Sequence, residues 1–137
     1  MTLKLNSQFE GEVSVSLEIN SYLNNGCMYI GLVMQGEYPE PYGDLTVNLV
    51  EKVPDYCGYV DLNNMPELEE FIDKNNLGEF TGLTQKSGFC EYPLYHFNAE
   101  RLRELCPEGM KAYESCIERK KESIIEMDAV RNRRRSR

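Results

Sequence analysis

The residues best suited to chemistry lie in the aromatic segment 89–97, with the sequence FCEYPLYHF. Cys90 and His96 share strand parity, so an extended backbone turns both side chains to one face. A thiol and an imidazole in contact can form a nucleophile with its base, or half of a zinc site. Residues six apart on a strand are about 20 Å apart, however, and the chain contains no CxxC pair. We therefore expect neither cysteine catalysis nor a metal site, and His96 is expected as a polar group at a sheet edge.

A second candidate is a run of carboxylates, Glu67, Glu69, Glu70 and Asp73. Such groups can bind a cation or act as general acid and base. Acidic side chains in the first turn of a helix also interact favourably with its dipole, and no histidine accompanies these four. Helix stabilisation is therefore the simpler interpretation. Since the chain also lacks a glycine-rich phosphate loop and a spaced Ser-His-Asp set, we expect no catalytic residues, no cofactor and no enzymatic activity.

Charge is distributed unevenly along the 137 residues, which are enough for one domain. Residues 1–98 contain four lysines, no arginine and fifteen carboxylates, a net charge of −11. Residues 99–137 contain eleven basic and eight acidic side chains, a net charge of +3. An acidic body repels nucleic acid and attracts basic protein surfaces. The basic end carries five arginines: Arg131, Arg133, Arg134, Arg135 and Arg137.

The composition also indicates a compartment. Five cysteines at irregular spacing are typical of reduced thiols rather than a disulfide framework. No apolar run is long enough for a membrane span, and the first residues lack the apolar block of a secretion signal. We expect a cytoplasmic protein that does not contact membranes.

Alternation of polar and apolar residues over 12–20 predicts a strand with one solvent-exposed face. Asn24, Asn25 and Gly26 then predict a tight turn. Two prolines within 37–43 predict a loop, because proline lacks the donor that a central strand needs. Further strands are expected at 28–34, 45–50, 56–60 and 89–97, the last with Pro93 at an edge position or a bulge. A meander of adjacent antiparallel strands is the simplest topology for the strands from 12–20 to 56–60.

Helix signals follow the strands. Asn63 or Asn64 is expected to cap a short helix, and Gly78 to end it in a left-handed conformation before a turn-rich link. Asn98 is expected to cap a second helix. Helices are predicted over 99–105 and 110–130, with a break at 106–109. The fold class is therefore α+β: an antiparallel meander packed by one short helix over 1–98, then helices over 99–130. These form a single domain, 1–130, and the basic tail 131–137 is expected to be disordered.

Nine tyrosines and no tryptophan favour a protein-binding surface, because tyrosine offers large contact area with a polar tip. Loop tyrosines lie among carboxylates, and this mixture suits a basic partner. The alternative, that half of these rings belong to the core, stays open. The candidate partner-binding residues are Glu37, Tyr38, Glu40, Tyr42, Asp44, Asp55, Tyr56 and Asp61.

Glutamates also recur every fourth residue along the last predicted helix, advancing about 6 Å per step. The row comprises Glu114, Glu118, Glu122 and Glu126. Such a row can imitate the phosphates of a nucleic-acid backbone, but basic residues at 119–121 interrupt it. A solvated helix face is the simpler interpretation, and Glu118 and Glu122 are kept as candidate partner contacts.

Three segments carry a resemblance to a known family: TVNL at 46–49, VDLNNMPELEEFIDKNNLGEFTG at 60–82 and SGFCEYPLYHFN at 87–98. They resemble the domain-of-unknown-function 4313 family of gut bacteria, their phages and conjugative elements. The resemblance covers about residues 12–98 and leaves the later helices outside. The family offers no catalytic residues that match positions of this chain.

This setting implies a small accessory protein in the cytoplasm of a bacterial host. The leading hypothesis is a non-enzymatic inhibitor that binds a basic host defence protein, most concretely an anti-CRISPR protein acting on an effector nuclease through its acidic surface. The alternative is a mobile-element protein that binds nucleic acid through the five arginines of residues 131–137. Direct nucleic-acid binding is not expected under the leading hypothesis. Either a monomer or a homodimer through the last helix is compatible with the sequence.

Overall fold

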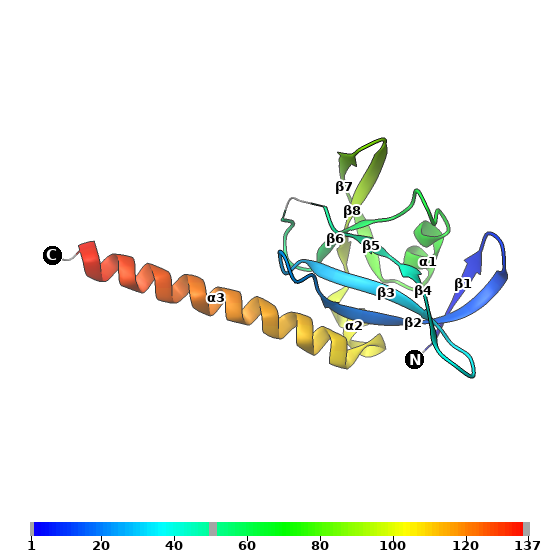
Figure 1. Ribbon diagram of the computed structural model, residues 1–137, viewed down its shortest axis with the longest axis horizontal. Coiled ribbons are helices and arrows are strands. Elements are labelled where there is room, and N and C mark those ends of the chain that lie inside the picture. Colours follow the sequence, from blue (N-terminus) through cyan, green and yellow to red (C-terminus); the bar gives the residue numbers. More distant parts are fainter. Residues whose placement is uncertain (1, 50–51, 136–137) are drawn as a thin grey trace.

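The computed structural model describes residues 2–49 and 52–135, and the side chains of its last helix up to residue 122 except Lys120. The fold is α+β as predicted, with the strands in two four-stranded antiparallel sheets (Figure 1). The strands are β1 (Leu3–Ser7), β2 (Gly11–Ser21), β3 (Met28–Met34), β4 (Glu40–Asp44), β5 (Thr46–Val47), β6 (Cys57–Val60), β7 (Gly78–Ser87) and β8 (Cys90–Phe97). The helices are α1 (Leu68–Lys74), α2 (Ala99–Leu105) and α3 (Pro107–Arg135).

The first sheet is a meander in the order β1-β2-β3-β4. Of the four strands predicted for a single meander, only those at 12–20 and 28–34 lie in it, as β2 and β3. The strands predicted at 45–50 and 56–60 correspond to β5 and β6 of the second sheet, and β1 and β4 were not predicted. Its central strand β2 buries Val15, Leu17 and Ile19 on one face, which confirms the alternating pattern. The turn at Asn24-Asn25-Gly26 is also confirmed, with Gly26 at a φ of 71°. The connection is longer than a two-residue hairpin, however, and spans 22–27.

The loop predicted for 37–43 is wrong in its second half, because residues 40–44 form β4. This strand lies at the edge of the first sheet, where the missing N–H of Pro41 is tolerated. The strand predicted for 45–50 is reduced to β5, since the chain changes sheets there. Leu45 N–H donates to Ile30 O at 2.9 Å, whereas Thr46 already pairs with Val60 of the second sheet.

The second sheet has the order β5-β6-β8-β7, so β8 lies between two strands. His96 pairs with Cys57 on one side and Glu79 on the other, which corrects its predicted edge position. Pro93 pairs only with Thr84 of β7, because the pairing of β8 with β6 ends at Leu94, and the register shift of β7 between Phe80 and Thr84 lies next to it. Both features agree with the edge position or bulge predicted for Pro93. The turn-rich link predicted after the first helix is wrong, because most of it is the edge strand β7.

The predicted cap of α1 is wrong. The N-cap is Glu67, without a side-chain hydrogen bond. Asn64 instead donates to the carboxylate of Asp61, and Asn63 donates to Glu91 O across the sheet. Both asparagines therefore hold the loop before the helix rather than its first turn.

The left-handed position after α1 is Asn76, at a φ of 55°, and not Gly78. Glycine is required at 78 for another reason. A Cβ there would lie 2.8 Å from the carbonyl oxygen of His96, so a side chain would obstruct the close approach of β7 to β8.

Asn98 caps α2 as predicted, accepting from the N–H of Arg101 at 3.3 Å. The helix α3 begins earlier than predicted, with Pro107 in a first-turn position where its missing N–H is harmless. It also continues to Arg135, so residues 131–135 are helical where a disordered tail was expected. No glycine or proline follows Gly109 in the sequence, and arginine favours helix.

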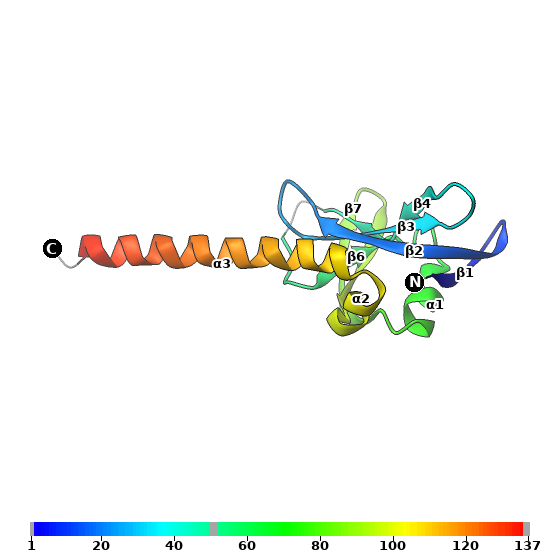
Figure 2. The same ribbon diagram turned by 90° about the horizontal axis from the view of Figure 1, so that it is seen from below.

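The core lies between the inner faces of the sheets and the three helices. The first turns of α3 contribute Met110, Tyr113 and Ile117 to it and pack along β2. Beyond them, α3 projects away from the body, in the direction opposite to α1 (Figures 1 and 2). Within the described part of the chain, no helix has both the length and the apolar composition needed to cross a membrane.

Candidate functional site: an acidic groove beside helix α1

The candidate partner-binding residues from the sequence are spread over the molecule. Glu37 and Tyr38 lie in the connection between β3 and β4, and Tyr38 is 79% exposed. Asp55 precedes β6, and Glu118 and Glu122 lie on α3. The β3–β4 connection and the projecting part of α3 are at opposite ends of the molecule (Figures 1 and 2).

Several of these candidates make contacts within the fold. Asp44 accepts from the Tyr29 hydroxyl at 2.8 Å, and Asp61 accepts from Asn64. Tyr42 packs against the main core. Glu40 is exposed on β4. Tyr59, another loop tyrosine by sequence, is buried.

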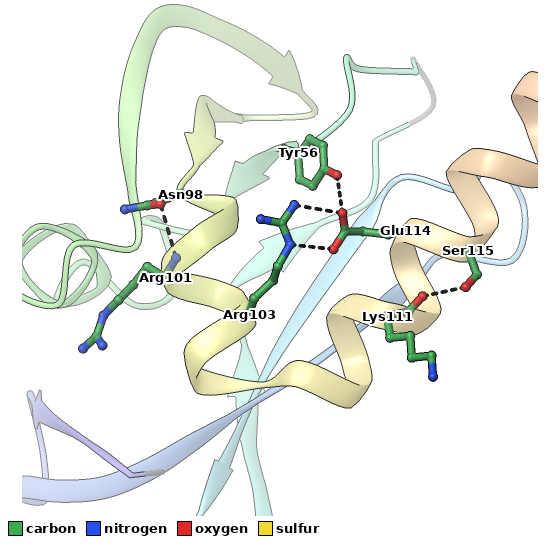
Figure 3. A network of polar contacts seen from close by, with 7 residues as sticks. All are labelled: Tyr56, Asn98, Arg101, Arg103, Lys111, Glu114 and Ser115. Atoms are coloured by element: carbon green, nitrogen blue, oxygen red, sulfur yellow. Dashed lines mark hydrogen bonds and ion pairs between the residues drawn. The ribbon is translucent and has the colours of Figure 1, made fainter.

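Tyr56 lies in a cluster with Arg103 and Glu114 (Figure 3), in which burial and the contact with Glu114 raise the pKa of Tyr56 and the contact with Arg103 lowers the pKa of Glu114. The Tyr56 hydroxyl donates to Oε2 of Glu114 at 2.7 Å, and Arg103 binds the same carboxylate. Perturbed pKa values mark functional sites in some proteins and structural ion pairs in others. Here every charge has a partner within the cluster, which joins the start of β6 to α2 and α3. The arrangement is that of a structural clamp.

Four of the five arginines of the basic end belong to the last turns of α3, far from the sheets (Figure 1). The backbone of Arg131, Arg133, Arg134 and Arg135 is helical. Their side chains and the whole of Arg137 lie outside the described residues.

An acidic groove lies between α1 and the paired strands β7 and β8. It is a hollow of about 580 Å³. Its lining residues are Pro66, Glu67, Glu69, Glu70, Ile72, Asp73, Gly78, Glu79, Phe80 and Tyr95. Five of these are carboxylates, and the described lining includes no lysine, arginine or histidine.

The five carboxylates are not neutralised within the molecule. The ion pairs among the described residues are Lys4–Glu12, Arg101–Glu104 and Arg103–Glu114, and none involves the groove. Glu67 and Glu70 also line a second, smaller hollow together with Lys4 and Lys74, but neither lysine forms an ion pair with them. Repulsion among these neighbouring carboxylates raises the free energy of the protein when no cationic ligand is bound in the groove.

One carboxylate oxygen of the groove is both buried and unpaired. Oε2 of Glu67 is shielded from solvent and has no hydrogen-bond partner among the described residues. A buried acceptor without a donor costs free energy, and a buried charge costs more.

Aromatic rings form the wall of the groove on the sheet side. Phe80 is 51% exposed, and its ring centroid lies 5.9 Å from that of the buried Tyr95 at an angle of 39°. Burial, and then the charges of Glu69 and Asp73, raise the pKa of Tyr95, so its hydroxyl stays neutral and able to donate. Carboxylates beside aromatic faces suit a guanidinium or ammonium group, which binds both.

The described histidine, cysteine, aspartate and glutamate side chains include no group of three placed to hold a metal ion. The groove carboxylates are therefore spread along a surface rather than converging on one point. Such an arrangement fits a ligand with several positive charges better than a single ion.

The fold and the groove can now be set beside known proteins. A family model described as a domain of unknown function, DUF4313, matches residues 16–117. The chain belongs to this family. Comparisons with curated proteins and with solved structures found no match.

The DUF4313 match contains every residue of the acidic groove. It also extends past the segment 12–98 that carried the resemblance in sequence, through α2 to the last buried turn of α3 at Ile117. The projecting part of α3, with its arginine-rich end, lies outside the match. The groove is thus part of the DUF4313 domain, and the basic end is an addition to it.

A larger hollow of about 860 Å³ lies where the β2–β3 connection meets α3. Its lining includes Lys52, Cys116 and Arg119 beside several amides. It borders residues 50–51, which are outside the described part of the chain. For that reason we take the acidic groove, whose strands and helix are described without a gap, as the candidate site of this DUF4313 protein.

Proposed function

We propose that this DUF4313 protein is a non-catalytic binding module that captures a basic segment of a protein partner in the acidic groove. The observation that carries the proposal is the set of five uncompensated carboxylates beside exposed Phe80 and buried Tyr95. An arginine or lysine side chain in the groove gains ion pairs with the carboxylates and a cation–π contact with the exposed ring of Phe80.

The rest of the body assists this capture at a distance. Residues 1–98 carry a net charge of −11. A field of this sign steers basic surfaces toward the protein and raises the association rate, while the groove supplies the short-range contacts. The same field repels nucleic acid, so the favoured partner is a basic protein.

The most concrete form of this function is inhibition of a host defence nuclease by a phage or mobile-element protein, that is, an anti-CRISPR activity in the bacterial cytoplasm. The support is the resemblance to a family of phages and conjugative elements together with the acidic body. Effector nucleases hold guide and target nucleic acid in positively charged channels. A basic segment of such a channel has the chemistry that the groove requires, and an acidic protein seated there would exclude the nucleic acid.

The first test is the affinity for a fluorescent arginine-rich peptide, measured by anisotropy for wild type and for the variant E69Q/D73N/E79Q. We expect the dissociation constant to rise at least about tenfold in the variant, equivalent to about 1.4 kcal/mol. The control E37Q/E40Q changes two exposed carboxylates of the β3–β4 hairpin that lie outside the groove, and E10Q/E37Q/E40Q, which adds the exposed Glu10, removes the same three charges as the groove variant. Equal affinities for all of these proteins would contradict the groove as the site.

The second test addresses the partner. Purified CRISPR effector nucleases loaded with guide are titrated with the wild-type protein, and target cleavage is measured. We expect stoichiometric inhibition that the groove variant loses and the E37Q/E40Q control keeps. If the wild-type protein leaves target cleavage unchanged for every effector tested, the anti-CRISPR form of the proposal is overturned. The binding of a basic peptide by the groove is then judged by the anisotropy measurement alone.

A second candidate function is nucleic-acid binding through the basic end. It is favoured by five arginines within the last seven residues, on a helix that projects from the body. Deleting 131–137 discriminates between the two functions. Loss of oligonucleotide retention on deletion would support this candidate, whereas the proposed function predicts unchanged peptide binding by the groove.

A further inference from the structure

The chain contains two groups of charged residues of opposite sign. The acidic groove has five carboxylates without an ion pair among the described residues. The end of α3 has the five arginines of residues 131–137. A guanidinium is the group that best matches a carboxylate and an aromatic face at once. The chain therefore contains a ligand of the chemistry that its own groove selects.

The two charged regions of one molecule cannot meet. The helix α3 is continuous over 29 residues, about 43 Å at 1.5 Å per residue. Its first turns are fixed on β2 by Met110, Tyr113 and Ile117, which are buried. From there it runs away from the body on the side opposite to α1 (Figures 1 and 2). Bringing the arginines back to the groove of the same molecule would break the helix or detach it from the core.

We infer that the acidic groove binds the arginine-rich end of α3 from a second copy of the chain. This inference rests on the proposed function, since it uses the same groove and the same ligand chemistry. The contact is head to tail: each molecule offers one groove and one basic end, so an open chain of copies or a closed ring forms. Because the groove is open to solvent and the contact consists mainly of charge pairs, the association is weak and sensitive to salt.

The self-contact gives the groove a built-in competitor. A basic partner must displace the arginine end of a neighbouring copy before it binds. At low protein concentration the grooves are open, and at high concentration they are occupied. Partner binding and self-association are then mutually exclusive, so a basic partner peptide that occupies the groove dissociates the associated copies.

The experiment is sedimentation velocity of the full chain at low salt and at about 0.5 M salt, where charges are screened within a few ångströms. Two variants are compared, E69Q/D73N/E79Q in the groove and R131Q/R133Q/R134Q in the basic end. We expect the wild type to associate with rising concentration at low salt and to dissociate at high salt. Each variant alone should sediment as a monomer.

The decisive sample is an equal mixture of the two variants. The groove variant still has its basic end, and the end variant still has its groove, so one complementary contact remains. We expect a one-to-one complex that does not grow further. A mixture that stays monomeric while the wild type associates would overturn the inference. Variants that each associate like the wild type would also overturn it, because such a result would indicate that the copies pair through α3 instead.

Controls separate this inference from the proposed function and from the nucleic-acid alternative. The double variant K111Q/K121Q removes two exposed charges from α3 outside the basic end and should associate like the wild type. The monomeric end variant should bind the arginine-rich peptide with wild-type affinity. If it does so while the wild type never self-associates, only the inference of this subsection fails. Association that disappears on nuclease treatment would also overturn it, because nucleic acid would then be the bridge.

Discussion

The guanidinium of Arg103 in α2 holds the carboxylate of Glu114 in α3 with two parallel hydrogen bonds. Nε donates to Oε1 at 2.8 Å and Nη2 donates to Oε2 at 2.9 Å. The Tyr56 hydroxyl donates to the same carboxylate at 2.7 Å (Figure 3). This contact ties the start of β6 and both later helices together, and so fixes the direction in which α3 leaves the body.

The clamp predicts a loss of stability in acid. The hydrogen bonds from Arg103, helped by Tyr56, lower the pKa of Glu114 from 4.5 to about 2. A carboxyl whose pKa is lower in the folded state stabilises the protein above its unfolded pKa, and this stability is lost as the pH falls from about 4.5 toward 2. Because Arg103 is half exposed, we expect about 1–2 kcal/mol at neutral pH rather than the full value of the shift.

The measurement is the free energy of unfolding by urea for wild type and Glu114→Gln, from pH 7 to about pH 2. All other carboxylates titrate in both proteins, so they cancel in the difference. We expect the difference to be largest at neutral pH and to shrink toward zero at the acid end. A difference that stays constant over this range would show that Glu114 does not titrate as its contacts indicate.

Tyr113 stabilises the backbone of Tyr56 through its hydroxyl. The N–H of Tyr56 donates to Tyr113 Oη at 2.9 Å, and Tyr56 has a left-handed φ of 64°. Substituting Tyr113→Phe keeps the edge-to-face ring contact, at 5.6 Å, but leaves this N–H without its partner. We expect a loss of about 1–2 kcal/mol in the free energy of unfolding, and faster hydrogen exchange at the Tyr56 amide. Tyr38→Phe, at an exposed position, is the control and should change neither quantity.

Gly109 allows α3 to lie close against β2. A Cβ at this position would lie 2.6 Å from the carbonyl oxygen of Ile19 and 2.8 Å from Cys106 Sγ. Alanine in a helix is better than glycine by up to about 1 kcal/mol, but displacing a strand backbone costs about 1–3 kcal/mol. We therefore expect Gly109→Ala to lower the melting temperature. Gly36→Ala has no atom within 4 Å of the new Cβ and should leave it nearly unchanged.

Elements with a local signal could be predicted from the sequence. The alternation of Val15, Leu17 and Ile19 reflects one buried face of β2, and Asn98 caps α2 through its own side chain. Both signals depend only on neighbours in the chain. The same holds for the turn at Gly26, where a positive φ is required.

The acidic groove could not be predicted in this way. Its helix side was visible as a run of carboxylates, for which stabilisation of the helix dipole is a sufficient explanation. Its sheet side depends on β7, whose residues are mostly exposed and therefore lack the apolar alternation of a strand. Only the pairing of Glu79 with His96 brings Glu79 and Phe80 beside α1. That pairing joins residues far apart in sequence, and no local pattern encodes it.

The groove also predicts a conflict between binding and stability. Glu69 and Asp73 lie four residues apart on α1, and like charges at that spacing destabilise a helix. The dipole of α1 favours Glu69 in its first turn and disfavours Asp73 in its last turn, so these two contributions oppose each other in the double variant E69Q/D73N. Relief of the like-charge pair should then raise its free energy of unfolding at low salt by about 0.2–0.5 kcal/mol, with a correspondingly higher melting temperature. The variant should at the same time bind the arginine-rich peptide more weakly.

Differential scanning calorimetry at low and at about 0.5 M salt separates this charge effect from a change in packing, because salt screens repulsion and leaves packing in place. The advantage of the variant should shrink at high salt, where the wild type gains stability. The control E37Q/E40Q removes the same number of charges from the β3–β4 hairpin and should gain less. If the variant is less stable than the wild type at both salt concentrations, the two carboxylates stabilise the fold. That result would contradict the interpretation of the groove as a binding site for a cationic ligand.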